Sequence, residues 1–88
     1  MNLHDTVAIV TGGSGGLGGR ICHALAKGGV NIAILYNTRK DSAENLSKTL
    51  TRDTSIITKI YQCDVTDALQ IEKVVADVLK DFSRIDIL

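Results

Sequence analysis

The sequence predicts an α/β fold, the N-terminal half of a doubly wound parallel sheet with the order βαβαβα and the start of a fourth strand. Two observations predict it. Short apolar runs alternate with amphipathic segments along the 88 residues, and a glycine-rich stretch joins the first run to the first helix. The chain contains no proline and shows no composition break. Residues 1–88 are therefore expected to form one partial domain.

The first strand is expected at residues 7–10, a continuous apolar run that is typical of a strand buried on both faces. A helix should follow the glycine cluster, because apolar residues recur there at helical spacing. Its apolar face is predicted to contain Leu17, Ile21, Ala24 and Leu25. Lys27 would lie in the last turn, and Gly28-Gly29 would end the helix.

Two more strands are expected at residues 30–36 and 56–61, separated by a helix at 42–51. That helix should bury Ala43, Leu46 and Leu50 on one face. The strand at 56–61 is the least apolar of the three, which favours a place at the sheet edge. Right-handed crossovers then predict a strand order of 3-2-1, with a fourth strand beside the first.

The strongest helical periodicity lies near the end of the chain. It consists of Ile71, Val74, Val75, Val78, Leu79 and Phe82. Residues 85–88 read as the start of a fourth strand, and the sequence stops inside it. We interpret the chain as a fragment, with apolar surface left open to association on one face of the sheet.

The glycine-rich stretch from Thr11 to Gly18 has the context of a phosphate-binding loop, because it follows a strand and opens a helix. A helix N-terminus presents free N–H groups and partial positive charge to a pyrophosphate. Glycine permits the tight turn and the close approach, and the Ser14 hydroxyl could add a hydrogen bond. A Walker A loop is excluded, because Gly19 and Arg20 stand where lysine and Ser/Thr are required.

The motif T-G-x-x-x-G-x-G at residues 11–18 resembles the glycine motif of the short-chain dehydrogenase/reductase family. Two further motifs of that family are similar to segments of this chain, namely Asp64-Val65-Thr66 and residues 84–88. The resemblance therefore covers the whole chain. It implies an NAD(P)-binding Rossmann fold. By resemblance, Asp64 accepts a hydrogen bond from the adenine amino group and Val65 packs on the ring. Taken alone, Asp64 would be interpreted as a helix N-cap or a turn aspartate. The predicted cofactor-binding residues are Gly12, Ser14, Gly16, Leu17, Gly18, Asn37, Thr38, Arg39, Asp64 and Val65.

The residues after the second strand favour NADP(H) over NAD(H). An NAD enzyme usually places a carboxylate there to hold the ribose 2′-hydroxyl, but residues 36–40 carry none and Asp41 lies too far along. Arg39 or Lys40 could instead pair with a 2′-phosphate. One mark of many NADP-preferring relatives is missing, because Gly15 stands where they carry a basic residue. The alternative is that both cations belong to a solvated loop.

The resemblance implies an oxidoreductase that transfers hydride between the nicotinamide and a small carbonyl or alcohol substrate. Chemistry like that of the 3-oxoacyl reductases is one option. The resemblance also implies that the full-length relative is a homo-oligomer. Family catalysis rests on a Ser and a Tyr-x-x-x-Lys motif. Tyr36 and Lys40 form such a string on the adenosine side, so we reject it as catalytic. No catalytic residue is predicted, and the chain alone is expected to be inactive. A stand-alone nucleotide-binding module and a non-functional remnant stay open as alternatives.

Charge and composition limit the partners. The formal net charge is zero, which gives no broad electrostatic attraction to nucleic acid or to a membrane surface. The sequence shows neither a signal-peptide pattern nor an apolar run of the roughly 18–20 residues that span a bilayer. Cys22 and Cys63 lack metal-ligand spacing, so no metal site is predicted. They are expected to be reduced core thiols of a cytoplasmic protein.

Overall fold

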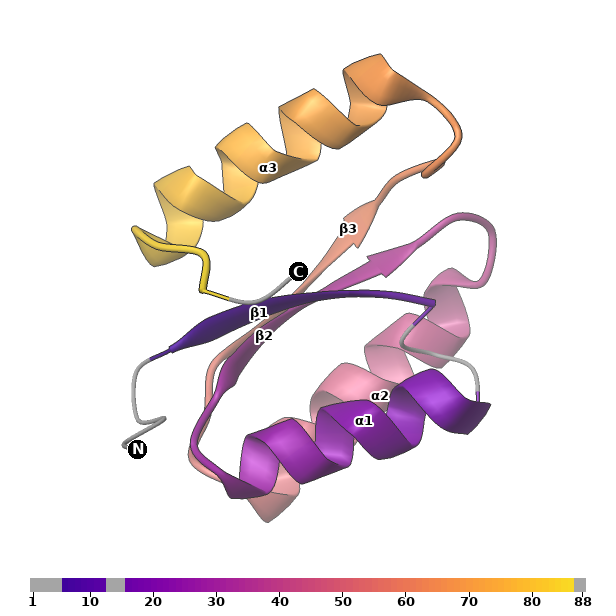
Figure 1. The fold of residues 1–88 in the computed structure, drawn as a ribbon. Coiled ribbons are helices and arrows are strands. Elements are labelled where there is room, and N and C mark those ends of the chain that lie inside the picture. Colours follow the sequence, from indigo (N-terminus) through magenta and orange to yellow (C-terminus); the bar gives the residue numbers. More distant parts are fainter. Residues whose placement is uncertain (1–5, 13–15, 87–88) are drawn as a thin grey trace.

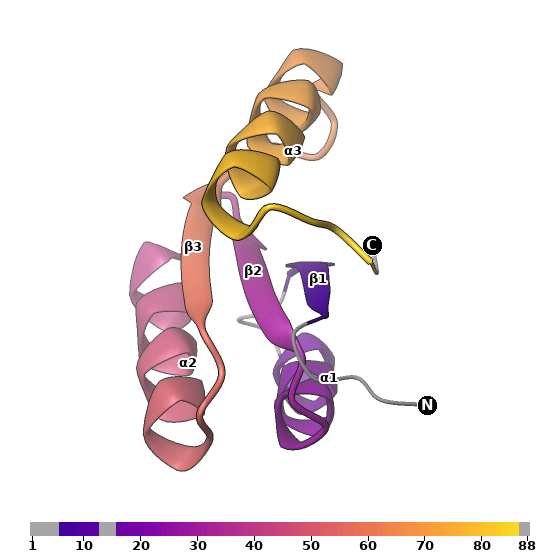
Figure 2. The same cartoon turned by 90° about the vertical axis from the view of Figure 1, so that its left-hand side faces the viewer.

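The computed structural model describes residues 6–12 and 16–86, apart from the Leu17 side chain, and it shows a parallel α/β fold (Figure 1). The element order is β1 (Val7–Thr11), α1 (Gly16–Lys27), β2 (Asn31–Tyr36), α2 (Lys40–Asp53), β3 (Thr58–Gln62) and α3 (Ala68–Phe82). Helices α1 and α2 cover one face of the sheet and α3 lies over the other (Figure 2). The predicted fold class is confirmed. Among the residues that the structure describes, no helix combines the length and the apolar character that a bilayer span requires.

Strand β2 is central in the described sheet, between β1 and β3, so the predicted 3-2-1 order is confirmed. Both pairings are parallel, with Val7 opposite Asn31 in one and Ile32 opposite Thr58 in the other. The segment after α3 returns to the free side of β1, where the Asp86 N–H donates to the Val7 carbonyl over 2.9 Å. This is where the fourth strand was expected. Residues 87–88 lie outside the described part of the chain.

The second and third strands begin later than predicted. β2 begins at Asn31 rather than 30, and β3 begins at Thr58 rather than 56. The Asn31 side chain explains part of the difference, because its Oδ1 accepts a hydrogen bond from the Ile57 N–H over 2.8 Å. The Ile57 N–H is therefore bonded to a side chain, while the Ile57 carbonyl accepts from the Ile32 N–H over 3.1 Å. Ile56 is buried without belonging to the strand.

The alternating side chains of the sheet build a separate apolar core on each face. The core under α3 contains Val7, Ile9, Ala33, Leu35, Cys63, Val74 and Val78. The core under α1 and α2 contains Cys22, Ala26, Ile32, Ile34, Ala43, Leu50 and Ile56. Both cysteines are buried and free, as the sequence predicted.

The predicted apolar face of α1 is wrong at Ile21 and Ala24 and confirmed at Leu25, which packs against the core. Ile21 is 46% exposed and Ala24 is exposed, whereas Cys22 and Ala26 are buried against the sheet and Leu25 is half-buried. The helix therefore packs through its small residues, which allow a close approach to the strands. The predicted ending is confirmed, because Gly29 adopts a φ of 88° after the last helical residue.

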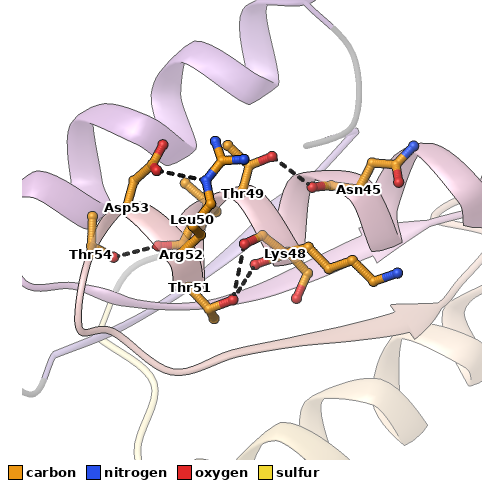
Figure 3. A network of polar contacts seen from close by, with 9 residues as sticks. Asn45, Lys48, Thr49, Leu50, Thr51, Arg52, Asp53 and Thr54 are labelled. Carbon is orange, nitrogen blue, oxygen red and sulfur yellow. Dashed lines mark hydrogen bonds and ion pairs between the residues drawn. The ribbon is translucent and has the colours of Figure 1, made fainter.

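Helix α2 extends past its predicted end at residue 51 to Asp53, and threonine hydroxyls bond to carbonyls in its last turns (Figure 3). The Thr51 hydroxyl donates to the Ser47 carbonyl over 3.0 Å, and the Thr54 hydroxyl donates to the Leu50 carbonyl over 2.7 Å. The last turn itself is closed by the backbone, because the Thr54 N–H donates to the Leu50 carbonyl over 3.0 Å. The predicted buried face is confirmed for Ala43 and Leu50, whereas Leu46 is half-buried.

The long apolar stripe of α3 is only partly buried. Val74 and Val78 are buried, but Ile71 is 37% exposed and Leu79 is 46% exposed. The stripe is wider than the contact with the sheet, so its flank faces outward. The sequence predicted exposed apolar surface on one face of the sheet, but the strand residues under α3 are buried and the exposed apolar surface lies on α3 itself. The N-cap of the helix is Asp67, whose Oδ1 accepts hydrogen bonds from the first-turn N–H groups of Leu69 and Gln70.

Candidate cofactor site

The ends of the three strands open onto one cavity of about 530 Å³. It is lined by Thr11, Gly12, Leu35, Tyr36, Asn37, Thr38, Arg39, Cys63, Asp64, Val65 and Thr66. All of these residues lie at or just after the carboxyl end of a strand. This is the place where open parallel sheets bind their ligands, and the volume suits a small organic molecule.

The first glycine of the glycine-rich stretch, Gly12, occupies a backbone conformation that favours glycine. Gly12 has a φ of 62°, in the left-handed region that other residues rarely adopt, and its N–H donates to the Leu35 carbonyl over 3.3 Å. A Cβ placed on Gly12 or on Gly16 would meet nothing within 4 Å, so open space lies beside both. Gly16 begins α1, and Gly18 lies half-buried in its first turn. The predicted contact of Ser14 lies outside the described residues, and so does the side chain of Leu17.

The loop between β2 and α2 forms the second wall of the cavity. Asn37, Thr38 and Arg39 are all exposed and all line the cavity. The Asn37 carbonyl accepts a hydrogen bond from Gln62 Nε2 over 3.3 Å, which joins this loop to the end of β3. The structure thus brings together three of the residues that the sequence predicted.

The structure separates the two cations that the sequence left as alternatives. Arg39 lines the cavity, and no side-chain hydrogen bond caps α2 at this position. Lys40 is the first residue of α2, and its Nζ lies 3.9 Å from Glu44 Oε1. Asp41 lies in the first turn of the helix and does not line the cavity. Arg39 is thus the one cationic side chain among the described lining residues.

The third wall carries the one carboxylate among the described lining residues, Asp64. Its Oδ1 accepts hydrogen bonds from the Thr66 N–H over 2.9 Å and from the Thr66 hydroxyl over 2.6 Å. These bonds hold the pKa of Asp64 below its ordinary value. The N-cap interpretation of Asp64 is wrong, because Asp67 takes that role, whereas the turn interpretation is confirmed. Val65 lies beside it with its apolar side chain 51% exposed.

Five lining residues were not predicted from the sequence. They are Thr11, Leu35, Tyr36, Cys63 and Thr66. Position in the fold could have identified most of them, since they terminate predicted strands. Tyr36 also packs against the core under α1 and α2, so it links that core to the cavity. The identity of this residue alone does not predict that it contacts both the core and the cavity.

The parallel sheet, the glycine turn and the cavity at the carboxyl ends of the strands are the features of a Rossmann-type domain. The chain matches the family described as short chain dehydrogenase over residues 6–88. It is 39% identical to the NADP-dependent mannitol dehydrogenase of Alternaria alternata over 88 residues and 40% identical to the sorbose reductase of Candida albicans over 86 residues. The chain therefore belongs to the short-chain dehydrogenase/reductase family.

Each of these two alignments covers 98% of this chain, but only 33% of the mannitol dehydrogenase and 30% of the sorbose reductase. The chain thus spans about a third of the length of the curated relatives it matches.

Solved structures agree on the fold. The NADPH-dependent 3-quinuclidinone reductase from Rhodotorula rubra superposes with a TM-score of 0.89 at 33% identity, covering 97% of this chain and 32% of that one. A xylitol dehydrogenase solved with NAD⁺ gives a TM-score of 0.90 at 30% identity, covering 99% of this chain and 33% of that one. Both nicotinamide cofactors therefore occur among the structural neighbours.

Proposed function

We propose that this chain is the cofactor-binding part of an NADP(H)-preferring reductase, and that the adenosine half of the cofactor occupies the cavity at the strand ends. One observation carries the proposal. A left-handed glycine turn, a single lining cation at Arg39 and a single lining carboxylate at Asp64 surround one cavity among the described residues. These three groups differ in chemistry, and each suits a different part of the same molecule.

The pyrophosphate is assigned to the glycine turn and the N-terminus of α1. The residues proposed for it are Gly12, Ser14, Gly16, Leu17 and Gly18. Backbone N–H groups at the start of a 12-residue helix provide donors and partial positive charge without a cationic side chain. The open space beside Gly12 and Gly16 leaves room for phosphate oxygens to approach the backbone.

The adenine is assigned to Asp64 and Val65. Both hydrogen bonds to the Asp64 carboxylate fall on Oδ1, so Oδ2 is the oxygen left to accept a bond from the adenine amino group. The low pKa keeps this carboxylate ionised at neutral pH, which strengthens a bond from an N–H donor. The exposed side chain of Val65 offers an apolar surface for the ring.

The ribose phosphate is assigned to Asn37, Thr38 and Arg39. A guanidinium can bind a phosphate through two parallel hydrogen bonds, and no carboxylate stands among residues 36–40 to repel it. These residues therefore favour NADP(H) over NAD(H). The NAD⁺-bound neighbour shows that the fold alone does not decide between them.

Titration calorimetry with NADP⁺ and NAD⁺ tests the assignment. Arg39→Ala should weaken NADP⁺ binding by about tenfold or more and leave NAD⁺ binding nearly unchanged, since one bond to a charged group is removed. Lys40→Ala is the matched control, because Lys40 faces Glu44 and lies outside the cavity. Tighter binding of NAD⁺ than of NADP⁺ by the unsubstituted chain would overturn the preference.

We further propose that the whole enzyme transfers hydride between the bound nicotinamide and a small carbonyl or alcohol substrate, as a homo-oligomer. The relatives named for mannitol and sorbose make a sugar alcohol and its ketose the first pair to assay. The cofactor supplies the hydride, and the residues here bind and orient its adenosine end. The buried free thiols of Cys22 and Cys63 suit the reducing cytoplasm, where we place the protein.

A stand-alone nucleotide-binding module is the second candidate, and the cavity itself favours it, because binding needs no catalytic group. Saturable NADP⁺ binding by the 88-residue chain would separate such a module from a non-functional remnant, which would show none. Binding without turnover is expected of the module and of the reductase alike, so a Ser and a Tyr-x-x-x-Lys motif encoded in frame after codon 88 would be the result that favours the reductase.

A further inference from the structure

We propose that Gln70, at the start of α3, is a positioning residue that fixes the Asp64 carboxylate in the orientation that reads the adenine amino group. The inference rests on the proposed function of the cavity, because it concerns the wall that Asp64 forms. Gln70 does not line the cavity itself. It acts on the cavity through the backbone of Asp64.

The contact is direct. Gln70 Oε1 accepts a hydrogen bond from the Asp64 N–H over 2.8 Å, at the point where the chain has left β3. One residue earlier, the Cys63 N–H still donates to the Tyr36 carbonyl over 2.8 Å. Gln70 therefore supports the first backbone N–H beyond the sheet, on the segment that carries the adenine-binding residues.

A second bond sets which end of the Gln70 amide faces Asp64. Gln70 Nε2 donates to Asp67 Oδ2 over 3.1 Å, and a carboxylate accepts only from the NH₂ end of the amide. The carbonyl end is thereby directed to the Asp64 N–H. Asp67 is itself held by α3, because its Oδ1 accepts from the Leu69 N–H over 3.0 Å.

Three polar groups of Asp64 are engaged in hydrogen bonds. Its N–H is bonded to Gln70, its carbonyl accepts from the Asp67 N–H over 3.0 Å, and its Oδ1 is bonded to Thr66. Of the polar atoms of Asp64, Oδ2 has no hydrogen bond within the described part of the chain, so it is the atom that can accept one from a ligand. A side chain that is ordered before binding loses less conformational freedom when the ligand arrives, so Gln70 should raise affinity for the group that Oδ2 binds.

The test compares NADP⁺ with its hypoxanthine analogue, in which a carbonyl oxygen replaces the adenine amino group. Titration calorimetry on the full chain gives the ratio of the two affinities. Gln70→Ala should lower this adenine preference by about two- to tenfold, the effect of immobilising one side chain, and leave binding of the analogue unchanged. A change that only loosens α3 would weaken both cofactors alike and leave the ratio unmoved.

Two variants serve as controls. Lys73→Ala lies three residues further along the same exposed flank of α3, and it should leave the ratio unchanged. The double variant Asp67→Asn with Gln70→Glu reverses donor and acceptor within the pair, keeps the N-cap oxygen and keeps an acceptor for the Asp64 N–H. It should restore most of the adenine preference. It also keeps the inference testable if Gln70→Ala does not fold, because loss of the preference in a folded double variant would then overturn the inference.

Asp64→Ala separates the two proposals. If it abolishes the adenine preference while Gln70→Ala leaves the preference intact, the role of Gln70 is wrong and the cavity assignment stands. If Asp64→Ala itself keeps the wild-type preference, the assignment of adenine to Asp64 fails, and the role of Gln70 fails with it.

Discussion

Burial of single side chains sets their reactivity in this protein. Cys22 lies fully buried in α1, and burial raises its thiol pKa from 9.0 to about 11. Burial also raises the pKa of Cys63, with the nearby carboxylates of Asp64 and Asp67 adding to the effect. Tyr61 follows the same rule, because partial burial and its hydrogen bond to Asp81 raise the pKa of its hydroxyl. None of the three is prepared for nucleophilic or acid–base work near neutral pH.

The rate of alkylation measures how accessible and how ionised the Cys22 thiol is. In the folded chain iodoacetamide should leave Cys22 unmodified at pH 8, because the thiolate is both scarce and shielded, whereas urea should make it reactive. The folded pKa lies above the unfolded value, so its contribution to stability is present below pH 9.0 and is lost as the pH rises toward about 11. Rapid modification of Cys22 under native conditions, read by peptide mass spectrometry, would contradict its burial.

The elements show where sequence patterns sufficed and where they did not. Alternating apolar runs located all three strands and helices, because burial on a parallel sheet demands continuous hydrophobic segments. The buried face of α1 could not be read, since small residues such as Cys22 and Ala26 carry a weaker apolar signal than the exposed Ile21. The end of α2 could not be read either, since its last residues, Arg52 and Asp53, are polar and carry no apolar periodicity.

The candidate site divides in the same way. Gly12, Asn37–Arg39 and Asp64 could be placed at the cavity because strand ends and family motifs mark them. The role proposed for Gln70 was not predicted. An Asp followed three residues later by Gln is typical of a helix start, but this spacing does not indicate that Gln70 also accepts a bond from the Asp64 N–H. Exact contacts depend on how the chain leaves β3, and that path is set by tertiary packing.

Helix α3 should depend on its N-cap. Asp67→Ala removes the acceptor for the first-turn N–H groups and should lower the free energy of unfolding by about 1 kcal/mol. Asp67→Ser keeps an oxygen at that position and should recover most of the loss. Urea denaturation followed by circular dichroism gives both values. Equal stability of Asp67→Ala and the unsubstituted chain would show that the cap contributes nothing.

The segment after α3 is held by a carboxylate. Asp86 accepts from Arg84 Nε and Nη2, each over 2.7 Å, and from the Val7 N–H over 2.9 Å. These bonds lower the pKa of Asp86 below its ordinary value of 3.8. Its contribution to stability is therefore complete above pH 3.8 and is lost as the pH falls through the lower folded value. Asp86→Asn should flatten the acid limb of the stability curve, whereas an unchanged limb would contradict this role.

At the scale of the whole molecule, one sheet separates two apolar cores. Leu50 lies in the core under α1 and α2, and Val78 lies in the core under α3. Leu50→Ala should cost about 2–5 kcal/mol and Val78→Ala about 2 kcal/mol. The double variant should show the sum within about 0.5 kcal/mol, because the two sites share no partner. A larger deviation in urea denaturation would mean that the sheet couples its two faces.

The reciprocal bonds between Val7 and Asp86 join positions 79 residues apart. The remaining strand contacts link neighbours in the element order, so this one closes the longest loop in the described chain and should form late in folding. Its donor at Val7 is a single amide whose exchange with solvent deuterium can be followed by itself. That exchange rate reports how often the segment at 84–86 detaches while the rest of the sheet stays intact.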